Sequence, residues 1–391
     1  MMTQVFARSA RIIVRRTLVC ATLIGVSFVP ASMNAQANLS SQGYGFPTGQ
    51  LSARAYGAGG SLAEMDPLSP VNPASIALLP SRILFMQIEP EFRNVKSGNG
   101  ADATTTARYP VVFGAIPVAS NFVMSLSAST LLDRTSSTSF STTQRLADGE
   151  DVAMTTTYRI DGAMSDIRLA GAWIPANWLR VGVGLHGIAG HNLVSLTQAF
   201  DDSLRFSAFS QSRVLGFGGG AVSGGVQLVS KMFVAAASAR LGGTLNLSSE
   251  DTVLKSARVP NRFGASLAYI GIANSTFSVR TSRDNWSALG DLGSSNLHAV
   301  DAWDTSVGAD VAGPHLGQRI LFLRGGYRMR TLPFAAAGEQ VSEKSFSAGA
   351  GTAFANNHVL ADVALIHASR TANLSASEKA WTVSIGIAVR P

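Results

Sequence analysis

The stretch Trp381-Thr-Val-Ser-Ile-Gly-Ile-Ala-Val389 alternates apolar residues with small or polar ones. A β-strand points successive side chains to opposite faces, so this stretch has one apolar face and one small or polar face. The same two-residue period recurs at 179–185, 263–269 and 321–329. Repeated from about residue 81 onward, the pattern predicts an all-β protein whose strands meet an apolar surrounding on one side.

The composition separates this chain from ordinary soluble domains. It has 391 residues, a mean hydropathy of +0.20 and only 14% charged residues, whereas a soluble domain carries about 25%. No stretch after residue 35 contains the roughly 18 uninterrupted apolar residues of a spanning helix, while a spanning strand needs only about 9–11. With the alternating pattern, the composition predicts a transmembrane antiparallel β-barrel.

Turn signals give the number of strands between residues 81 and 391. Six short turns are apolar or tight, at 117–120, 174–178, 229–232, 271–275, 313–318 and 356–358. Seven polar connections alternate with them, at 95–103, 146–150, 200–203, 247–251, 285–297, 331–340 and 370–374. These connections imply about 14 strands, and an even number with short turns on one side is typical of bacterial outer-membrane barrels.

The first 37 residues have the features of a cleaved signal peptide. A short apolar core at 17–30 follows four arginines, and Ala35-Gln36-Ala37 offers a cleavage site. Removing residues 1–37 leaves 27 basic and 24 acidic residues, a net charge of +3 in place of +7, so the basic character is no argument for nucleic acid. Cys20, the only cysteine, is removed as well. We expect export to the outer membrane of a Gram-negative type of cell.

Residues 38–80 differ from the alternating remainder. Stretch 53–63 is rich in small residues, and three prolines, Pro67, Pro70 and Pro73, fall within seven residues. Proline cannot donate to a sheet ladder, so this segment is a poor spanning strand. The sequence therefore predicts an N-terminal plug over 38–80 and a barrel over 81–391.

Charged residues in the clear strands fall on the face opposite the apolar one. Arg240, Arg280, Arg324 and Arg328 are the strongest examples, and an outward arginine would cost about 2–4 kcal/mol at the bilayer midplane. These four are candidate luminal ligand contacts, because a guanidinium can hold a carboxylate through two donors. The alternative is that they are solvated or paired charges that keep the lumen wet. Near 161–165 the apolar residues change from one set of alternate positions to the other. This change predicts a bulge or emergence of the strand from the membrane.

The motifs that would carry chemistry are weak. Gly182-Val-Gly-Leu-His-Gly187 has the spacing of a dinucleotide-binding loop, which needs a strand, a turn and a helix, yet it lies inside an alternating strand. The six histidines have no metal-binding spacing, and no G-x-S-x-G motif is present. We expect no cofactor, no metal and no enzymatic activity; a hydrolytic barrel would need a serine and a histidine to meet near the outer rim.

Residues 53–66, followed by Asn72-Pro73-Ala74, resemble the N-terminus of the outer-membrane long-chain fatty-acid and hydrocarbon transporters. The resemblance implies a fourteen-stranded barrel plugged by an N-terminal hatch that contains Asp66, Asn72, Pro73 and Ala74, with Asn72 and Pro73 fixing its exit into the first strand. It also implies passive transport of small hydrophobic molecules such as fatty acids, which leave sideways through a gap in the wall.

Related secretion-shuttle barrels share the same start, so a non-transporting barrel that docks exported proteins, or that has a structural envelope role, is the alternative. The implied partners are outer-membrane lipids, a small hydrophobic ligand and the barrel-assembly machinery, with exported proteins under the alternative. The chain departs from the transporters in its outer loops, which look short. Pro110 and Pro260 are the candidates for a break in the wall.

Overall fold

The computed structural model describes residues 41, 44–97, 100–145, 150–250, 252–292, 297–316, 319–336, 339–373 and 376–391. These residues belong to one compact unit. The predicted signal peptide, residues 1–37, lies outside them. In the described ranges no helix is long and apolar enough to cross a membrane.

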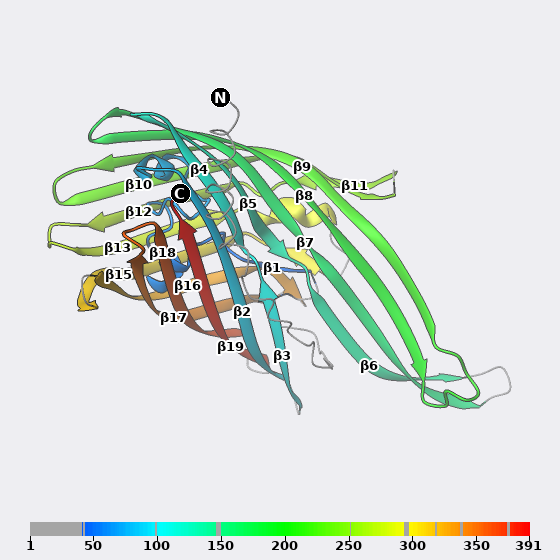
Figure 1. Ribbon diagram of the computed structural model, residues 1–391. Coiled ribbons are helices and arrows are strands. Elements are labelled where there is room, and N and C mark those ends of the chain that lie inside the picture. The colour runs from blue at the N-terminus through cyan, green and yellow to red at the C-terminus, as the bar shows by residue number, and fades with distance from the viewer. Residues whose placement is uncertain are drawn as a thin grey trace, which may run out of the picture. The chain divides into compact units, whose positions relative to one another are not determined.

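The chain forms a closed, antiparallel barrel of fourteen strands (Figure 1), as predicted. Its last strand pairs with its first and closes the wall. The segments are β2 (Ile83–Ser97), β3 (Gly100–Arg108), β4 (Val111–Ala119), β5 (Phe122–Asp133), β6 (Ser136–Arg145), β7 (Asp151–Ala176), β8 (Leu179–Phe200), β9 (Phe209–Val229), β10 (Phe233–Ser249), β11 (Thr252–Arg258), β12 (Arg262–Tyr269), β13 (Ser275–Asp284), β14 (Leu297–Ala299), β15 (Ala302–Leu316), β16 (Arg319–Ala336), β17 (Glu339–Phe354), β18 (Val359–Asn373) and β19 (Ala376–Val389).

Four strands of the barrel are built from two segments each. The segments β3 and β4 both pair with β2, β5 and β6 both pair with β7, β11 and β12 both pair with β10, and β14 and β15 both pair with β16. Pro110 lies between β3 and β4, and Pro260 lies between β11 and β12. Both candidate prolines therefore mark interruptions of the wall, because proline supplies no ladder donor.

The predicted alternation of short turns and polar connections is confirmed. The six short turns join β4–β5, β7–β8, β9–β10, β12–β13, β15–β16 and β17–β18. We call their side of the barrel the turn end and the opposite side the loop end. The loops at the loop end are not uniformly short: β7, β8 and β9 extend past the rest of the wall there (Figure 1), and one connection contains η2 (Trp286–Leu292).

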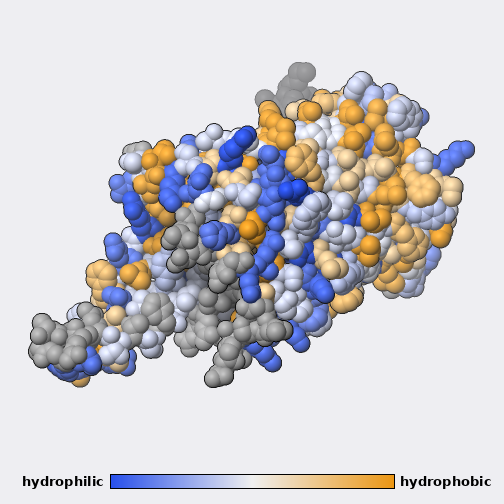
Figure 2. All heavy atoms as spheres, turned by 180° about the vertical axis from the view of Figure 1, so that it is seen from behind, coloured by the Kyte–Doolittle hydropathy of each residue, from blue (hydrophilic) through white to orange (hydrophobic). Residues whose placement is uncertain are grey.

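The outer face of the wall is apolar, as a lipid-facing surface requires. Alternate side chains such as Leu84, Val183, Leu185 and Phe346 are exposed, while their neighbours point into the lumen. Figure 2 shows apolar side chains gathered over the upper right of one face, and more hydrophilic residues on the part that projects at lower left. The lumen instead contains the buried arginines and carboxylates.

The hatch fills the lumen. It contains β1 (Phe46–Pro47), α2 (Ala53–Gly57) and η1 (Pro73–Leu78). The helix α2 packs against β16–β19, and η1 packs against β5 and β7–β9, so the segment crosses from one side of the barrel to the other. Small residues permit this fit: a Cβ on Gly326 would lie 2.2 Å from the carbonyl carbon of Ala58. The boundary between residues 80 and 81 stays a prediction.

The irregularity predicted at 161–165 lies on the neighbouring strand. Pairing of β7 with β8 runs without a shift from Met154 to Trp173, but the ladder of β5 with β7 shifts between Thr130 and Leu132, opposite Ser165 and Met164. The extra residue is in β5 and not in β7, and emergence from the membrane at this point stays a prediction. The apolar parity changes because the lumen becomes apolar toward the loop end, where inward-pointing Met164 joins a buried cluster with Trp286 of η2.

Candidate functional site

The four arginines singled out from the sequence all point into the lumen and are buried, but they are paired with acids. Asp304 of β15 lies between two of them: its Oδ2 is 2.9 Å from Nη1 of Arg280 and 2.7 Å from Nη2 of Arg328. The Arg328 Nε also donates to Asp304 Oδ1 at 2.8 Å. One carboxylate thus joins β13, β15 and β16 across the lumen wall.

Arg324 and Arg240 connect the wall to acids and to the hatch. Arg324 Nη1 lies 2.5 Å from Asp362 Oδ1, and its Nε lies 3.2 Å from Asp310 Oδ2. The same Asp310 oxygen lies 3.0 Å from Arg54 of α2. Arg240 Nη1 donates to Asp166 Oδ2 at 3.2 Å and to a hatch side chain, the amide oxygen of Gln50, at 3.1 Å.

A cavity of about 200 Å³ lies beside Arg324 at the turn end. Its lining combines the charges of Arg54, Asp310 and Asp362 with the apolar side chains of Leu79 and Phe322. Arg54 keeps 41% of its side chain exposed. Among the four candidate arginines, Arg324 is therefore the one with open volume beside a half-exposed cation.

Phe46 of β1 is surrounded by four arginines of the wall. The guanidinium carbons of Arg108, Arg330, Arg370 and Arg93 lie 4.6, 4.7, 4.8 and 5.7 Å from the ring centroid. We call these five residues the Phe46 cage. A cation over an aromatic face is attracted by the ring quadrupole, most strongly where water is excluded, and the Phe46 side chain is only 4% exposed. The cage therefore anchors the start of the hatch.

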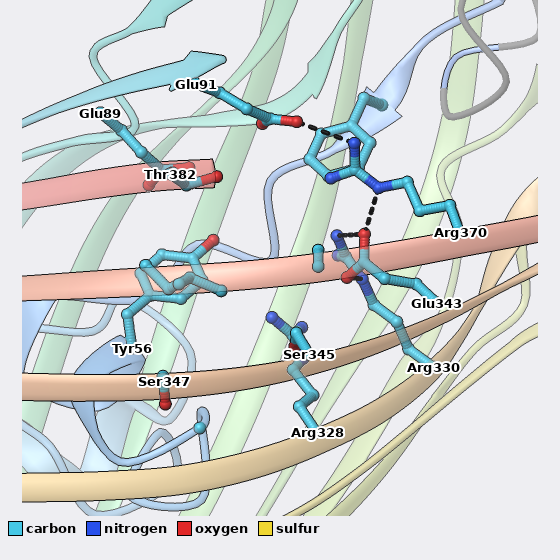
Figure 3. A pocket seen from close by; sticks show the side chains of 14 residues that line it. Tyr56, Glu89, Glu91, Arg328, Arg330, Glu343, Ser345, Ser347, Arg370 and Thr382 are labelled. Atoms are coloured by element: carbon cyan, nitrogen blue, oxygen red, sulfur yellow. Dashed lines mark hydrogen bonds and ion pairs between the residues drawn. The ribbon is translucent and has the colours of Figure 1, made fainter. Parts of the chain in front are cut away.

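Carboxylates compensate the charge of the cage. Figure 3 shows Arg370 between Glu91 and Glu343, at 2.8 and 2.6 Å, and Arg330 on the same Glu343 at 2.6 Å. These side chains line a cavity of about 30 Å³, and Tyr56 of the hatch lines it as well. Burial raises the pKa of the Tyr56 phenol. A buried charge is costly unless it is paired, and removal of one partner of a buried pair costs about 3–5 kcal/mol. The network thus holds wall and hatch in one arrangement.

The four predicted hatch residues lie where the hatch turns. Asp66 Oδ2 accepts from the hydroxyls of Ser52 and Ser69 at 2.5 and 2.7 Å. Asn72 caps η1 by accepting from the Ala74 backbone at 2.9 Å, and Pro73 occupies the first turn. These contacts fix the path of the chain toward β2.

Several hatch residues that reach the wall were not predicted from the sequence. Gln50, Arg54 and Phe46 are examples. Glu64 is another: its carboxylate accepts from Ser238 at 2.6 Å and lies 3.4 Å from Arg280. The hatch has no regular period, so its sequence carries no signal of which side chains point at the wall. The ranges that the structure describes contain no cluster of His, Cys, Asp and Glu that could hold a metal.

An apolar groove of about 450 Å³ opens on the outer face of β2, β4 and β5, near the turn end. Leu84, Ile116, Leu126 and Leu169 line it from the lipid-facing side. Ile83 and Ser125, which point inward, line its inner part. The groove therefore lies on the lipid side of β4, the segment that begins after the interruption at Pro110.

No protein-family model and no curated protein matches the sequence. Solved structures do match. A Pseudomonas aeruginosa FadL homologue aligns at a TM-score of 0.61 and 13% identity, over 88% of this chain and 99% of that one. The Ralstonia pickettii toluene transporter TbuX aligns at 0.55 and 14%, over 88% and 98%. The Pseudomonas putida toluene transporter TodX aligns at 0.53 and 12%, over 88% and 99%.

The chain has the fold of these transporter barrels. The resemblance found at the hatch is thereby confirmed at the level of fold across most of the chain. At 12–14% identity the likeness concerns the architecture alone.

Proposed function

We propose that this chain is an outer-membrane channel that passes small hydrophobic molecules, such as fatty acids or aromatic hydrocarbons, through a plugged lumen. The observation that carries the proposal is a fourteen-strand barrel with an apolar outer face and a hatch that fills its interior. The transporters that share the fold supply the class of cargo. Residues 1–37 would direct export, 38–80 would form the hatch and 81–391 the barrel.

A sideways route through the wall suits such a cargo. The centre of the lumen is filled by buried ion pairs, where an apolar molecule would displace partners of charged groups at high cost. Among the apolar places are the cluster around Trp286 at the loop end and the groove on the outer wall. Cargo would bind first at the loop end and reach the lipid at the groove.

The wall is interrupted beside β2. Its pairing with the next strand jumps from Met86–Val112 to Glu89–Arg108, so Gln87 and Ile88 lie opposite the Pro110 interruption without ladder partners on that side. Gln87 instead holds the hatch: its side chain accepts from the Ala53 backbone at 2.9 Å. Movement of the hatch would therefore release the inner side of this seam.

Mass spectrometry of lipids that co-purify with the full mature barrel tests the proposal. We expect a stoichiometric hydrophobic ligand, retained when exposed Arg205 is replaced by alanine. Loss on Arg324→Ala would assign the anionic end of the ligand to the cavity of about 200 Å³. An empty barrel, together with uptake of radiolabelled palmitate and toluene unchanged by deletion of the gene, would refute transport.

Docking of an exported protein is the second candidate, favoured by the sheet that β6–β9 form at the loop end. In the described residues, β6 pairs with β7 only, and β9 pairs with β10 only from Gly216 onward. The segment of β9 before Gly216 and the far side of β6 therefore present strand edges, which an extended peptide can extend. Cross-linking from Phe209 or Ser139 to an exported protein in intact cells would support docking, whereas an absence of cross-links at both positions would remove it.

A further inference from the structure

Three hydrogen-bonded side chains cross adjacent strands β7, β8 and β9 on the lumen side. Asp166 Oδ1 lies 2.7 Å from His186 Nδ1, and His186 Nε2 lies 2.8 Å from the Ser223 hydroxyl. A carboxylate only accepts hydrogen bonds, so a neutral His186 carries its proton on Nδ1, and its Nε2 accepts from Ser223. Acid, imidazole and hydroxyl thus stand in the order by which hydrolases activate a serine.

Asp166, the acid of this hydrogen-bonded set, is also held by contacts to its second carboxylate oxygen. Asp166 Oδ2 accepts from Gln50 of the hatch at 3.1 Å and from Arg240 at 3.2 Å. Two further donors fix the carboxylate plane and keep the charge that would stabilise an imidazolium. Ser223 and His186 are each 8% exposed, whereas Asp166 is 1% exposed. The serine and the imidazole are therefore less enclosed than the carboxylate.

Hydrogen-bond donors without partners lie beside Ser223. Gly184 is opposite Ser223 in the sheet, and a Cβ there would lie 2.6 Å from the serine oxygen and 3.3 Å from Cδ of Arg168. The Arg168 side chain therefore passes directly by the hydroxyl. In the described part of the chain, none of the three Arg168 guanidinium nitrogens has a hydrogen-bond partner, although the residue is 1% exposed.

The strand next to β7, β5, adds two buried hydroxyls that also lack a hydrogen-bond partner among the described residues. Ser127 is opposite Arg168, and Ser125, two residues earlier, lies on the same face of β5; within the described residues neither hydroxyl has a partner. The nearest acid, Asp166, already serves His186, Arg240 and Gln50. Unused donors at the place where negative charge would develop are what stabilises a tetrahedral intermediate.

The wall groove lies on the outer face of β5, the strand that carries Ser125 and Ser127. Ser125 lines it together with Leu126 and Ile116, which face the lipid. A molecule with an apolar chain could lie in the groove, and its ester would reach Arg168 where the ladders of β5 with β4 and β7, which are continuous at Ser125, open.

We propose that Ser223 is the nucleophile of a carboxylic-ester hydrolase built into the barrel wall, which acts on esters with an apolar acyl chain that enter from the bilayer. This activity goes beyond the proposed channel function and does not depend on it.

The steps balance as an ordinary ester hydrolysis. Ser223 Oγ attacks the ester carbonyl carbon while its proton passes to His186 Nε2, and the carbonyl oxygen becomes an oxyanion beside Arg168. Collapse breaks the ester C–O bond, and the alcohol leaves with the proton from His186. Water then attacks the acyl-serine, its proton goes to His186, and the free acid and Ser223 are released. Asp166 is a positioning residue, which holds the imidazole and its tautomer.

The test uses the full mature barrel in detergent, with a fluorophosphonate probe and 4-nitrophenyl octanoate. We expect covalent labelling at Ser223, located by peptide mass spectrometry, and ester hydrolysis that falls at least 100-fold in Ser223→Ala and His186→Asn. Ser266→Ala is the matched control, because Ser266 is an inward, buried serine without a partner among the described residues; it should keep both signals. The heat-shifted mobility of each variant on gels reports its fold.

Two further variants distinguish a role in the reaction from a general loss of structure. Arg168→Met should lower kcat and leave KM within about twofold, since the guanidinium acts on the oxyanion. Asp166→Asn should favour the wrong imidazole tautomer and also lower kcat rather than raise KM. A folded wild-type barrel with no label at Ser223, or with hydrolysis unchanged in Ser223→Ala, overturns the proposal and leaves the three side chains as a structural network.

Discussion

Replacing Phe46 by leucine should loosen the start of the hatch while the barrel stays intact. Leucine retains most of the buried apolar surface but has no ring quadrupole, so the change removes the attraction of the Phe46 cage. A desolvated cation over an aromatic face contributes about 2 kcal/mol. The ring has two faces for four guanidinium groups that are already paired with acids, so we expect a loss of about 2 kcal/mol, or about 30-fold in the population of released hatch.

Thiol labelling measures this population directly. The only cysteine, Cys20, falls in the segment predicted to be removed, so a Ser41→Cys substitution supplies one reporter near the cage. Ser41 is 2% exposed and its hydroxyl has no partner in the described residues, which makes the reporter nearly neutral. With a membrane-impermeant maleimide, the Phe46→Leu variant should react about 30 times faster than the parent.

Phe113→Leu provides the control, because Phe113 is a buried phenylalanine of the turn-end cluster whose loss should not affect labelling at residue 41. Equal labelling of the parent and the Phe46→Leu variant would refute the reasoning that the cage holds the hatch. Equal acceleration by both leucine substitutions would show that general packing, and not the arginines around the ring, controls release.

Three further outcomes are expected. Asp304→Asn should destabilise the barrel by about 3–5 kcal/mol in urea titrations, because Arg280 and Arg328 lose a shared buried carboxylate, whereas the exposed loop change Asp202→Asn should cost less than about 1 kcal/mol. Leu185→Arg on the lipid-facing wall should cost about 2–4 kcal/mol in bilayer refolding; the same cost for Leu204→Arg in a loop would contradict the assigned facing. Deletion of 38–74 should raise leakage of small polar solutes in liposome swelling, and unchanged leakage from a folded barrel would disprove that the hatch occludes the lumen.

The fold was predictable because lipid and lumen impose opposite demands on the two faces of each strand. In β19, Trp381, Ile385 and Ile387 are exposed on the outer face, while Thr382 and Ser384 are buried inside, as the alternation of this stretch predicts. Turn chemistry then sets the number of strands. The pattern is less informative where the lumen itself becomes apolar, as at Met164, because both faces of the strand then carry apolar side chains.

The site was only partly predictable. The inward direction of Arg240 and Arg280 follows from the two-residue period, but the residues that anchor the hatch do not. Phe46 and Glu64 lie in a segment without a period, and their partners come from strands far away in the sequence. The hydrogen-bonded set Asp166, His186 and Ser223 likewise depends on how three strands are aligned, which no single strand reveals.

The inward arginines could form a basic luminal patch or be paired with acids. The register between neighbouring strands decides between these two interpretations. Asp310 is directly opposite Arg324, and Glu343 is directly opposite Arg330. A slip of one residue would turn each arginine toward lipid, at about 2–4 kcal/mol each. A slip of two residues would keep the facing but shift each charge by about 7 Å along the strand, which separates the partners. Alternation therefore selects the face, and the buried ion pairs select the position along it, so these arginines specify the alignment of the wall as well as the charge of the lumen.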